Sequence, residues 1–227
     1  MNQLKILCFL NLIILIGVNA NAQSSKNAMA PKTNYPGYVI TPKSDTISGY
    51  LRFSNLIENQ EAVQFFKNTD DKKYQKQYKP EDIVAYQVGS KYYESVKYNY
   101  TGELGKNHFF LCLIDGPVSV YKWYEEPESR LLNTSKPMDK FAKNQQPKKN
   151  YNEKELVSKG FFKKLDGELQ DLRKLNNVAD FKKEMIALVD DDQDLAKKIA
   201  QEADGYKFED RMKIIEEYNA WYLSKSN

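Results

Sequence analysis

The side chains that most often carry acid–base catalysis are scarce in this sequence. His108 is the only histidine among 227 residues, and Cys112 follows it four positions later. In a β-strand, residues four apart point to the same face, but their Cα atoms are ~13 Å apart. An imidazole at that distance cannot activate a thiol. We therefore expect Cys112 to be a buried, unreactive thiol, and we assign no catalytic residue.

Three aspartates, Asp190, Asp192 and Asp194, have the spacing that begins a calcium-binding EF-hand loop. That loop also requires glycine at its sixth position and glutamate at its twelfth, where this chain has Leu195 and Gln201. We therefore favour a helix cap over a divalent ion here, and we predict no metal site and no cofactor. The common motifs of zinc proteases, serine hydrolases, disulfide oxidoreductases and phosphate-binding loops do not occur in the sequence either.

Paired carboxylates are the one catalytic arrangement that the sequence leaves open. Glycoside hydrolases place two acidic side chains on either side of the bond that they cleave. Glu94 and Asp115 are candidates for such a pair, but the distance between two carboxyl groups depends on the fold and does not follow from sequence spacing. A carboxylate-dependent hydrolase acting on glycan or peptide is therefore the alternative function.

Aromatic side chains are the enriched group, with 16 tyrosines, 11 phenylalanines and 2 tryptophans. Exposed on a sheet, Tyr and Trp can stack on sugars or line a peptide groove; buried, they pack in the core. We name Tyr93, Tyr121 and Trp123 as possible ligand-binding residues, while packing beneath the helices is the competing role, and the one we favour. The main functional expectation is a non-catalytic protein that binds a partner or ligand through its sheet.

Short segments with strand character recur about every ten residues in the first half of the chain. The first two, residues 38–41 and 46–53, flank the turn-forming residues 42–45. The other six are residues 62–67, 73–78, 83–88, 91–98, 107–114 and 118–124. This spacing predicts an antiparallel β meander of about eight strands within residues 37–124, as a sheet, a sandwich or an open barrel. The polar alternation of residues 73–78 is typical of an edge strand.

The second half of the chain has a different pattern. Residues 125–150 contain three prolines, five lysines and few large apolar residues, which indicates a basic loop or linker. From about Phe161 onward, apolar residues recur at spacings of three and four, which predicts a helical segment over residues 151–227 that packs on the sheet. Strands followed by segregated helices place the chain in the α+β class.

The N-terminal residues have the pattern of a secretory signal peptide. Lys5 precedes an almost wholly apolar run over residues 6–18, and Ala20-Asn21-Ala22 forms a small-x-small cleavage site. We therefore expect residues 1–22 to be removed, and the polar residues 23–36 to form a flexible lead-in. The apolar run is shorter than the ~20 residues that a membrane-spanning helix needs. The expected location is the periplasm, the outer membrane surface or the medium, and the chain is not expected to span a membrane.

The charge balance and the cysteine content exclude two further features, nucleic-acid binding and an intramolecular disulfide. Without Lys5 the chain has 33 basic and 31 acidic residues, a balance that does not favour nucleic-acid binding. Because Cys8 lies in the signal peptide, Cys112 would be the only cysteine of the mature chain and could form no intramolecular disulfide. The expected partners are an unknown envelope protein, a peptide or a glycan.

The opening hairpin also resembles that of a known group. Gly37-Tyr38, Asp45-Thr46 and Gly49-Tyr50, together with the late Ile214-Ile215 and Tyr218-Asn219, resemble segments of a diffuse group of uncharacterised secreted proteins of Bacteroidota. In that group a glycine usually precedes the aspartate, where this chain has Ser44. The resemblance implies an envelope setting and carries no activity that can be transferred.

Overall fold

A single open antiparallel sheet forms the centre of the protein. The computed structural model describes residues 29–98, 105–127, 153–165 and 167–225. Within these residues ten strands pair in the order β10-β9-β8-β7-β6-β5-β1-β2-β3-β4. Their bounds are β1 Thr33–Ile40, β2 Thr46–Phe53, β3 Val63–Phe66, β4 Lys76–Tyr78, β5 Ala85–Val88, β6 Lys91–Tyr98, β7 Lys106–Ile114, β8 Val118–Glu125, β9 Val157–Lys164 and β10 Gln170–Asp171.

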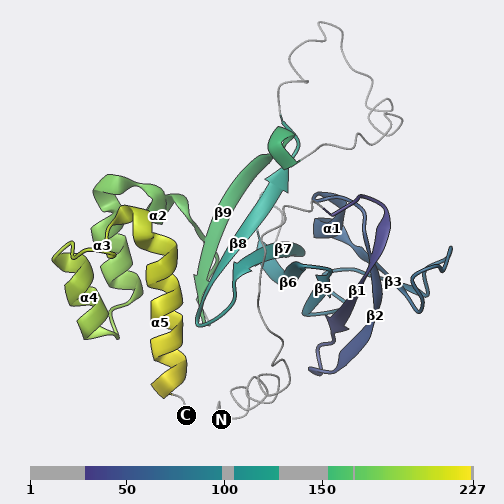
Figure 1. Ribbon diagram of the computed structural model, residues 1–227, viewed down its shortest axis with the longest axis horizontal. Helices are drawn as coiled ribbons and strands as arrows, with labels where there is room; N and C mark the ends of the chain where they lie inside the picture. Colours follow the sequence, from purple (N-terminus) through teal and green to yellow (C-terminus); the bar gives the residue numbers. More distant parts are fainter. Residues whose placement is uncertain (1–28, 99–104, 128–152, 166, 226–227) are drawn as a thin grey trace, which may run out of the picture.

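Helices follow the strands, so the α+β class is confirmed. They are α2 Arg173–Asn176, α3 Val178–Leu188, α4 Gln193–Ala200 and α5 Arg211–Lys225, with one short helix, α1 Glu58–Glu61, between β2 and β3 and 3-10 turns at Glu153–Glu155 and Phe208–Asp210. Helices α2–α5 lie together beside β8 and β9, whereas the N-terminal strands and α1 lie on the opposite side of the molecule (Figure 1). None of the described helices is long and apolar enough to cross a membrane.

The eight predicted strands all form, and the edge position predicted for residues 73–78 is confirmed by β4. One pairing departs from a simple meander, because β5 returns to pair with β1 and makes β1 an interior strand. The expected signal peptide and residues 128–150 of the expected basic loop lie outside the described residues. Of the expected lead-in, residues 33–36 already belong to β1.

The helix predicted from Phe161 onward is wrong for the residues up to Leu172. Residues 157–164 form β9, which pairs with β8 along its whole length, and β10 follows before the first C-terminal helix. The leucines that suggested a helix contact different parts of the protein instead. Leu165 follows β9 in a turn, with a positive φ of 34°. Leu169 packs against aromatic residues of the sheet, and Leu172 packs against the helical cluster. The spacing of three and four residues between these leucines therefore does not reflect a helix, because a turn between β9 and β10 separates them.

The two faces of the sheet have different roles, and we call them the inner and the outer face. The inner face carries two cores. The N-terminal core gathers buried residues of β1–β8 such as Val39, Leu51, Tyr86, Tyr93 and Phe109. The helical core gathers Val118, Val120 and Phe162 of the sheet with apolar residues of α2–α5. Cross-strand pairs keep the side chains of both cores on this one face.

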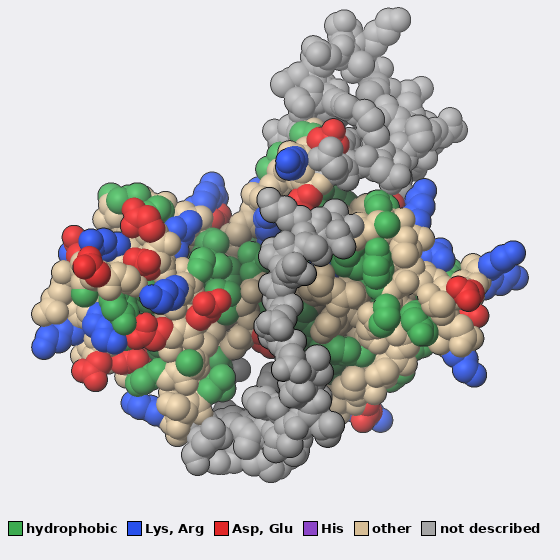
Figure 2. Space-filling view, viewed as in Figure 1, with side chains coloured by type: hydrophobic (Ala, Val, Ile, Leu, Met, Phe, Trp, Pro, Cys, Tyr) green, Lys and Arg blue, Asp and Glu red, His purple; other side chains and the backbone are tan. Residues whose placement is uncertain are grey.

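The outer face carries a smaller aromatic cluster, formed by Val96, Phe110, Tyr121, Trp123 and Phe161 with Tyr98, Cys112 and Leu169 at its margin. Its members come from β6–β9 and from the residue before β10, and none comes from a helix. In the view of Figure 2, charged side chains of both signs are interspersed over the helices, and fewer lie over the N-terminal strands.

Two side-chain amides attach other elements to the ends of β8. β7 pairs with β8 only at residues 120–122, so the backbone of Tyr124 and of Val118 lacks a strand partner on that side. Gln60 of α1 exchanges two hydrogen bonds with the Tyr124 backbone, at 2.9 and 2.6 Å. Asn219 of α5 does the same with Val118, at 2.9 and 2.8 Å. Each buried amide thus makes the two backbone hydrogen bonds that a neighbouring strand would otherwise make with that residue of β8.

The contact between α1 and β8 shows how strongly the sheet curls. In sheet order, four strands separate β2 from β8, a distance of roughly 24 Å in a flat sheet with strands ~4.8 Å apart. Because α1 directly follows β2 in the chain and still reaches Tyr124, the N-terminal strands must wrap around their own core. The Tyr86 hydroxyl, which donates to the Asn59 carbonyl oxygen at 2.6 Å, holds α1 over that core.

Candidate functional site

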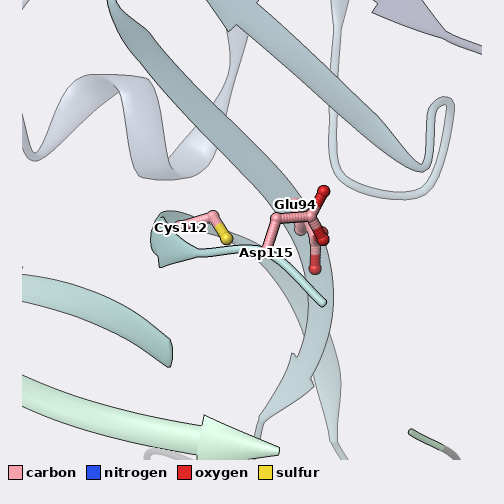
Figure 3. A group of neighbouring side chains, drawn as sticks. All are labelled: Glu94, Cys112 and Asp115. Carbon is pink, nitrogen blue, oxygen red and sulfur yellow. The ribbon is translucent and has the colours of Figure 1, made fainter. Parts of the chain in front are cut away.

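Three side chains with chemical potential meet on the outer face of the sheet. Glu94 of β6, Cys112 of β7 and Asp115 of the turn after β7 each place a donor atom within 4.8 Å of the other two. Figure 3 shows the two carboxylates side by side, with the sulfur directed toward them. Among the described residues, no other group of three such donors converges in this way.

A bulge in β7 brings Asp115 to this place. Cys112 is paired with Tyr121, but Ile114 is paired with Val120, so the register shifts by one residue between Cys112 and Ile114. Ile114 consequently points to the inner face, where it packs against the helical core, and Asp115 points to the outer face beside Glu94. Strict alternation from Cys112 would have placed Asp115 on the inner face. Bulges commonly redirect a side chain in this manner.

Tyrosines surround the acidic pair. The Tyr121 hydroxyl donates a hydrogen bond of 2.5 Å to Oε2 of Glu94. Tyr38 of β1 and Tyr92 of β6 lie on the same face, because each is paired with Gln87 of β5 between them, and both are half-buried. Burial raises the pKa of both phenols, and the nearby charge of Asp115, with that of Glu94 for Tyr92, raises it further. We call these four residues, Tyr38, Tyr92, Glu94 and Asp115, the Tyr–acid patch.

The electrostatic environment of the patch disfavours negative charge. Burial raises the pKa of Glu94, and repulsion from Asp115 raises it further, while the Tyr121 hydrogen bond and nearby Lys163 oppose the shift. Burial beside the sheet likewise raises the pKa of Asp115, although much of that side chain reaches solvent. Within the part of the chain that the structure describes, neither carboxylate forms an ion pair with a lysine or arginine. A positively charged group placed against the patch would therefore be stabilised.

The thiol of Cys112 is poorly suited to reaction. It is half-buried rather than fully buried as expected, and it donates to the carbonyl oxygen of Ile114 at 3.2 Å. Burial and the charges of Glu94 and Asp115 raise its pKa far above the ordinary range. Because the thiolate is the nucleophilic form, the site favours neither thiol catalysis nor thiol-based redox chemistry.

The three residues named from the sequence as ligand-binding candidates are buried, which agrees with packing, the role favoured for them, although Tyr121 and Trp123 pack on the outer face and not beneath the helices. Tyr93 is fully buried, Tyr121 is 2% exposed and Trp123 is 6% exposed. Tyr93 stacks on Tyr86 in the N-terminal core, with ring centroids 4.8 Å apart. Tyr121 and Trp123 pack against Phe110 on the outer face. None presents an aromatic face to solvent, and only the Tyr121 hydroxyl reaches the patch.

Two other motifs from the sequence have structural roles. Asp192 caps α4 by accepting a hydrogen bond from the Leu195 backbone, as predicted. Lys164 binds Asp190 and Asp191, which attaches this turn to the sheet. His108 lies in β7, edge-on to the Trp123 ring and 3.5 Å from a carboxylate oxygen of Glu61, and belongs to a different part of the outer face from the patch.

The sequence contained a partial signal for the Tyr–acid patch. The alternation of residues 92–98 places Tyr92 and Glu94 on one face, but nothing local indicates the bulge that adds Asp115. No protein-family model, curated protein or solved structure matches this chain.

Proposed function

We propose that the chain is an exported cell-envelope protein without catalytic activity, which binds a protein partner through the Tyr–acid patch on the outer face of its sheet. Export is supported by the signal-peptide pattern of residues 1–22. The contact that we propose is a lysine or arginine side chain of the partner, placed against Glu94 and Asp115.

One observation carries this proposal. Two carboxylates with raised pKa values lie side by side on the outer face. The aromatic cluster of this face contains no residue from a helix, and two half-buried tyrosines lie near the carboxylates. Holding like charges together disfavours the folded state, and a basic side chain from outside would relieve the repulsion. The tyrosine rings add a cation–π surface for the same basic group.

The test compares two doubly substituted mature proteins as baits for envelope proteins of the native host. Glu94→Gln with Asp115→Asn removes the charge of the patch, whereas Glu216→Gln with Asp194→Asn removes the same charge from exposed positions on the helices. We expect the first bait to lose a partner that the wild type and the second bait retain, with binding that weakens as salt is added. Equal capture by all three baits contradicts the proposal, and a retained glycan in place of a protein changes the class of partner.

A carboxylate-dependent hydrolase is the second candidate, and the proximity of Glu94 and Asp115 is the observation that favours it. Retaining glycosidases hold two carboxyl groups about 5 Å apart and raise the pKa of one. The best-defined pockets of the described residues are lined by other side chains, so neither of them is a substrate cleft for this pair. Release of reducing sugar or peptide products that is lost in Glu94→Gln and kept in Glu216→Gln would favour the hydrolase.

The export proposal has its own measurement. If Ala20-Asn21-Ala22 is the cleavage site, the exported protein begins at Gln23. The intact mass of the secreted or periplasmic protein should then lack residues 1–22. A mass that includes Met1 contradicts this proposal.

A further inference from the structure

A second surface feature, separate from the Tyr–acid patch, is an unpaired stretch of β2 next to the β1–β2 turn. β2 pairs with β1 along its whole length, but it pairs with β3 only at Tyr50 and Leu51. Within the described part of the chain, residues 46–48 therefore have a strand neighbour on one side only. All three of these residues are exposed. We call residues 46–48 the open edge.

The backbone groups of Thr46 and Ser48 point away from the sheet. A strand residue directs its N–H and its C=O to the same side, and successive residues alternate between the two sides. The carbonyl oxygen of Ile40 in β1 accepts a hydrogen bond from the Val84 N–H, on the side of β5, so Ile40 and Tyr38 face β5. Thr46 and Ser48 are their partners in β2 and must face away from β1. The open edge thus presents two N–H donors and two C=O acceptors with which no described strand pairs.

Such a row of alternating donors and acceptors matches an extended backbone. Proteins usually protect a free edge with short strands, lysine, proline or a bulge. The two ends of the sheet follow this rule, because β4 has three residues and β10 has two. The open edge instead reads Thr-Ile-Ser, with no charge and no proline, and Thr and Ile favour strands. Its sequence therefore permits a further strand to pair with it.

The open edge is complementary to a second copy of itself. Antiparallel pairing about a two-fold axis at Ile47 places Thr46 of each copy opposite Ser48 of the other. Both of these are hydrogen-bonded pairs, so four backbone hydrogen bonds form. The two Ile47 side chains, each 40% exposed, then lie directly opposite and cover each other. An axis at Ser48 would instead place Thr46 opposite Tyr50, where β3 already pairs.

Charged residues beside the open edge fit the same arrangement. With the axis at Ile47, Asp45 of one copy lies opposite Gly49 of the other. Lys67 directly follows Phe66, the β3 partner of Tyr50, so its backbone lies at that end of the open edge. Asp45 and Lys67 are exposed, and among the described residues neither takes part in an ion pair. Opposite charges therefore meet between the copies once at each end.

We propose that two copies of the chain associate through their open edges, as an antiparallel strand pair centred on Ile47 that joins the two sheets. The partner is a second copy because the edge matches itself in backbone groups, in its apolar side chain and in the charges beside it. The contact involves far fewer than the roughly 20–30 residues a side of a stable interface. The dimer is therefore weak and reversible.

Cysteine substitution captures a short-lived pair and reads its register. The proteins are Ile47→Cys, Thr46→Cys and Ser48→Cys, each of the mature chain and each with Cys112→Ser, so that the new cysteine is the only thiol. Across the axis, the Cα atoms of the two residues 47 lie ~4.5 Å apart, within the disulfide range of about 4.4–6.8 Å. Those of the two residues 46, or of the two residues 48, lie about 7–8 Å apart. Under mild oxidation we expect Ile47→Cys to form a disulfide dimer at least about fivefold faster than either neighbour.

A mixture tests the register from the other direction. Because Thr46 of one copy faces Ser48 of the other, at ~5.5 Å between Cα atoms, Thr46→Cys mixed with Ser48→Cys should cross-link faster than either protein alone. Equal cross-linking at the three positions, and no gain in the mixture, would indicate random collision and overturn the proposal. A disulfide to a different envelope protein in place of the dimer would overturn the second copy as the occupant.

Charge reversal tests the ends of the pair. In the Ile47→Cys protein, Asp45→Lys and Lys67→Glu should each slow cross-linking about threefold, the size of exposed ion pairs. The two changes together should restore the rate, because opposite charges then meet again between the copies. Glu216→Lys on α5, at an exposed position, is the control and should have no effect.

Circular dichroism of each variant confirms that it is folded before its rate is compared. A double charge variant that cross-links no faster than the single variants would overturn the proposed pairing, and so would an equal loss in Glu216→Lys. Since Glu94 and Asp115 are unchanged in all of these proteins, the result does not depend on the function proposed for the Tyr–acid patch.

Discussion

The apolar side chains of the N-terminal core and of the helical core are shielded from water in two different ways. Both cover apolar side chains on the inner face of one sheet, which must be removed from water for the fold to be stable. In the N-terminal region the strands curl around their own side chains and need only the single turn of α1. Around β8 and β9, helices α2–α5 cover the face instead. A sheet that bends can thus bury its own face, whereas a straighter part requires a separate layer.

β8 is the element that the two regions share. Its Tyr124 belongs to the N-terminal core, and its Val118 and Val120 belong to the helical core. The amides of Gln60 and Asn219 secure its two ends in the same manner, one from each region. Gly116 permits the second attachment, because a Cβ there would lie 2.6 Å from Nδ2 of Asn219. We infer that the regions differ in architecture but unfold as one unit.

The largest effects are expected from cavities in the two cores. Phe109→Ala should lower the free energy of unfolding by about 3–5 kcal/mol and Met185→Ala by about 2–5 kcal/mol, because both side chains are fully buried. Urea unfolding followed by circular dichroism measures the change. Val178→Ala, at a position 69% exposed, is the control and should change stability by less than about 0.5 kcal/mol.

The same variants test whether the regions unfold together. The chain has two tryptophans, Trp123 in β8 and Trp221 in α5. In single-tryptophan proteins made by Trp→Phe substitution, we expect both fluorescence transitions to coincide with that of circular dichroism. A Met185→Ala protein in which only the Trp221 transition moves would show two independent units and break the comparison.

Trp123→Ala should lower the free energy of unfolding by about 3 kcal/mol, because the indole packs on Phe110 in the aromatic cluster and is 6% exposed. This prediction replaces the expectation that Trp123 stacks on a ligand. Trp123→Phe keeps an aromatic ring and should recover most of the loss. A Trp123→Ala protein that is as stable as wild type but fails to bind its partner would restore the ligand-binding role.

Removing either amide attachment should have an intermediate effect. Gln60→Ala and Asn219→Ala each leave a buried backbone N–H and C=O of β8 without a partner, which should lower the free energy of unfolding by about 2 kcal/mol. Hydrogen exchange of the Tyr124 or Val118 amide should accelerate in the corresponding variant. Gln60→Glu and Asn219→Asp should also destabilise, since a carboxylate cannot donate to the carbonyl oxygen. Gln75→Ala, at an exposed position, is the control; a loss of similar size there would contradict this explanation.

The smallest effect concerns pH. Because burial raises the pKa of Glu94 and of Asp115 above their ordinary values of 4.5 and 3.8, the folded state holds these protons more tightly than the unfolded state. Their contribution to stability is therefore largest below the ordinary values and falls as pH rises through the folded pKa values. Glu94→Gln removes part of this fall while Gln can still accept the Tyr121 hydrogen bond. The variant should gain less than about 1 kcal/mol relative to wild type as the pH rises above the ordinary pKa of the glutamate.

Urea unfolding at a series of pH values measures this difference. Glu216→Gln, which changes the same charge on an exposed part of α5, should follow the pH dependence of the wild type. If Glu94→Gln and the wild type lose stability in parallel, the carboxylate pair is not strained in the folded protein. The main observation behind the Tyr–acid patch would then be withdrawn.

The sequence by itself determined the features that depend on neighbouring residues. Turn formers between alternating segments predicted eight strands and the polar edge strand β4, because turn geometry and side-chain alternation are local properties. The Asp192 cap is local in the same sense, since its side chain bonds to a backbone group three residues away. The α+β class followed from the change of period along the chain.

Tertiary structure alone decided the features that depend on distant residues. β9 is a strand because it pairs with β8, which lies more than thirty residues earlier at every pair. Its Phe162 and Phe161 then add to the helical core and to the aromatic cluster. Trp123 is buried because the rings of Phe110 and Tyr98 come from other strands. The meeting of Glu94 and Asp115 depends on one extra residue in β7, which reverses the face of everything after it. Such a shift follows from which register buries the most apolar surface across the whole sheet, and no local pattern contains that information.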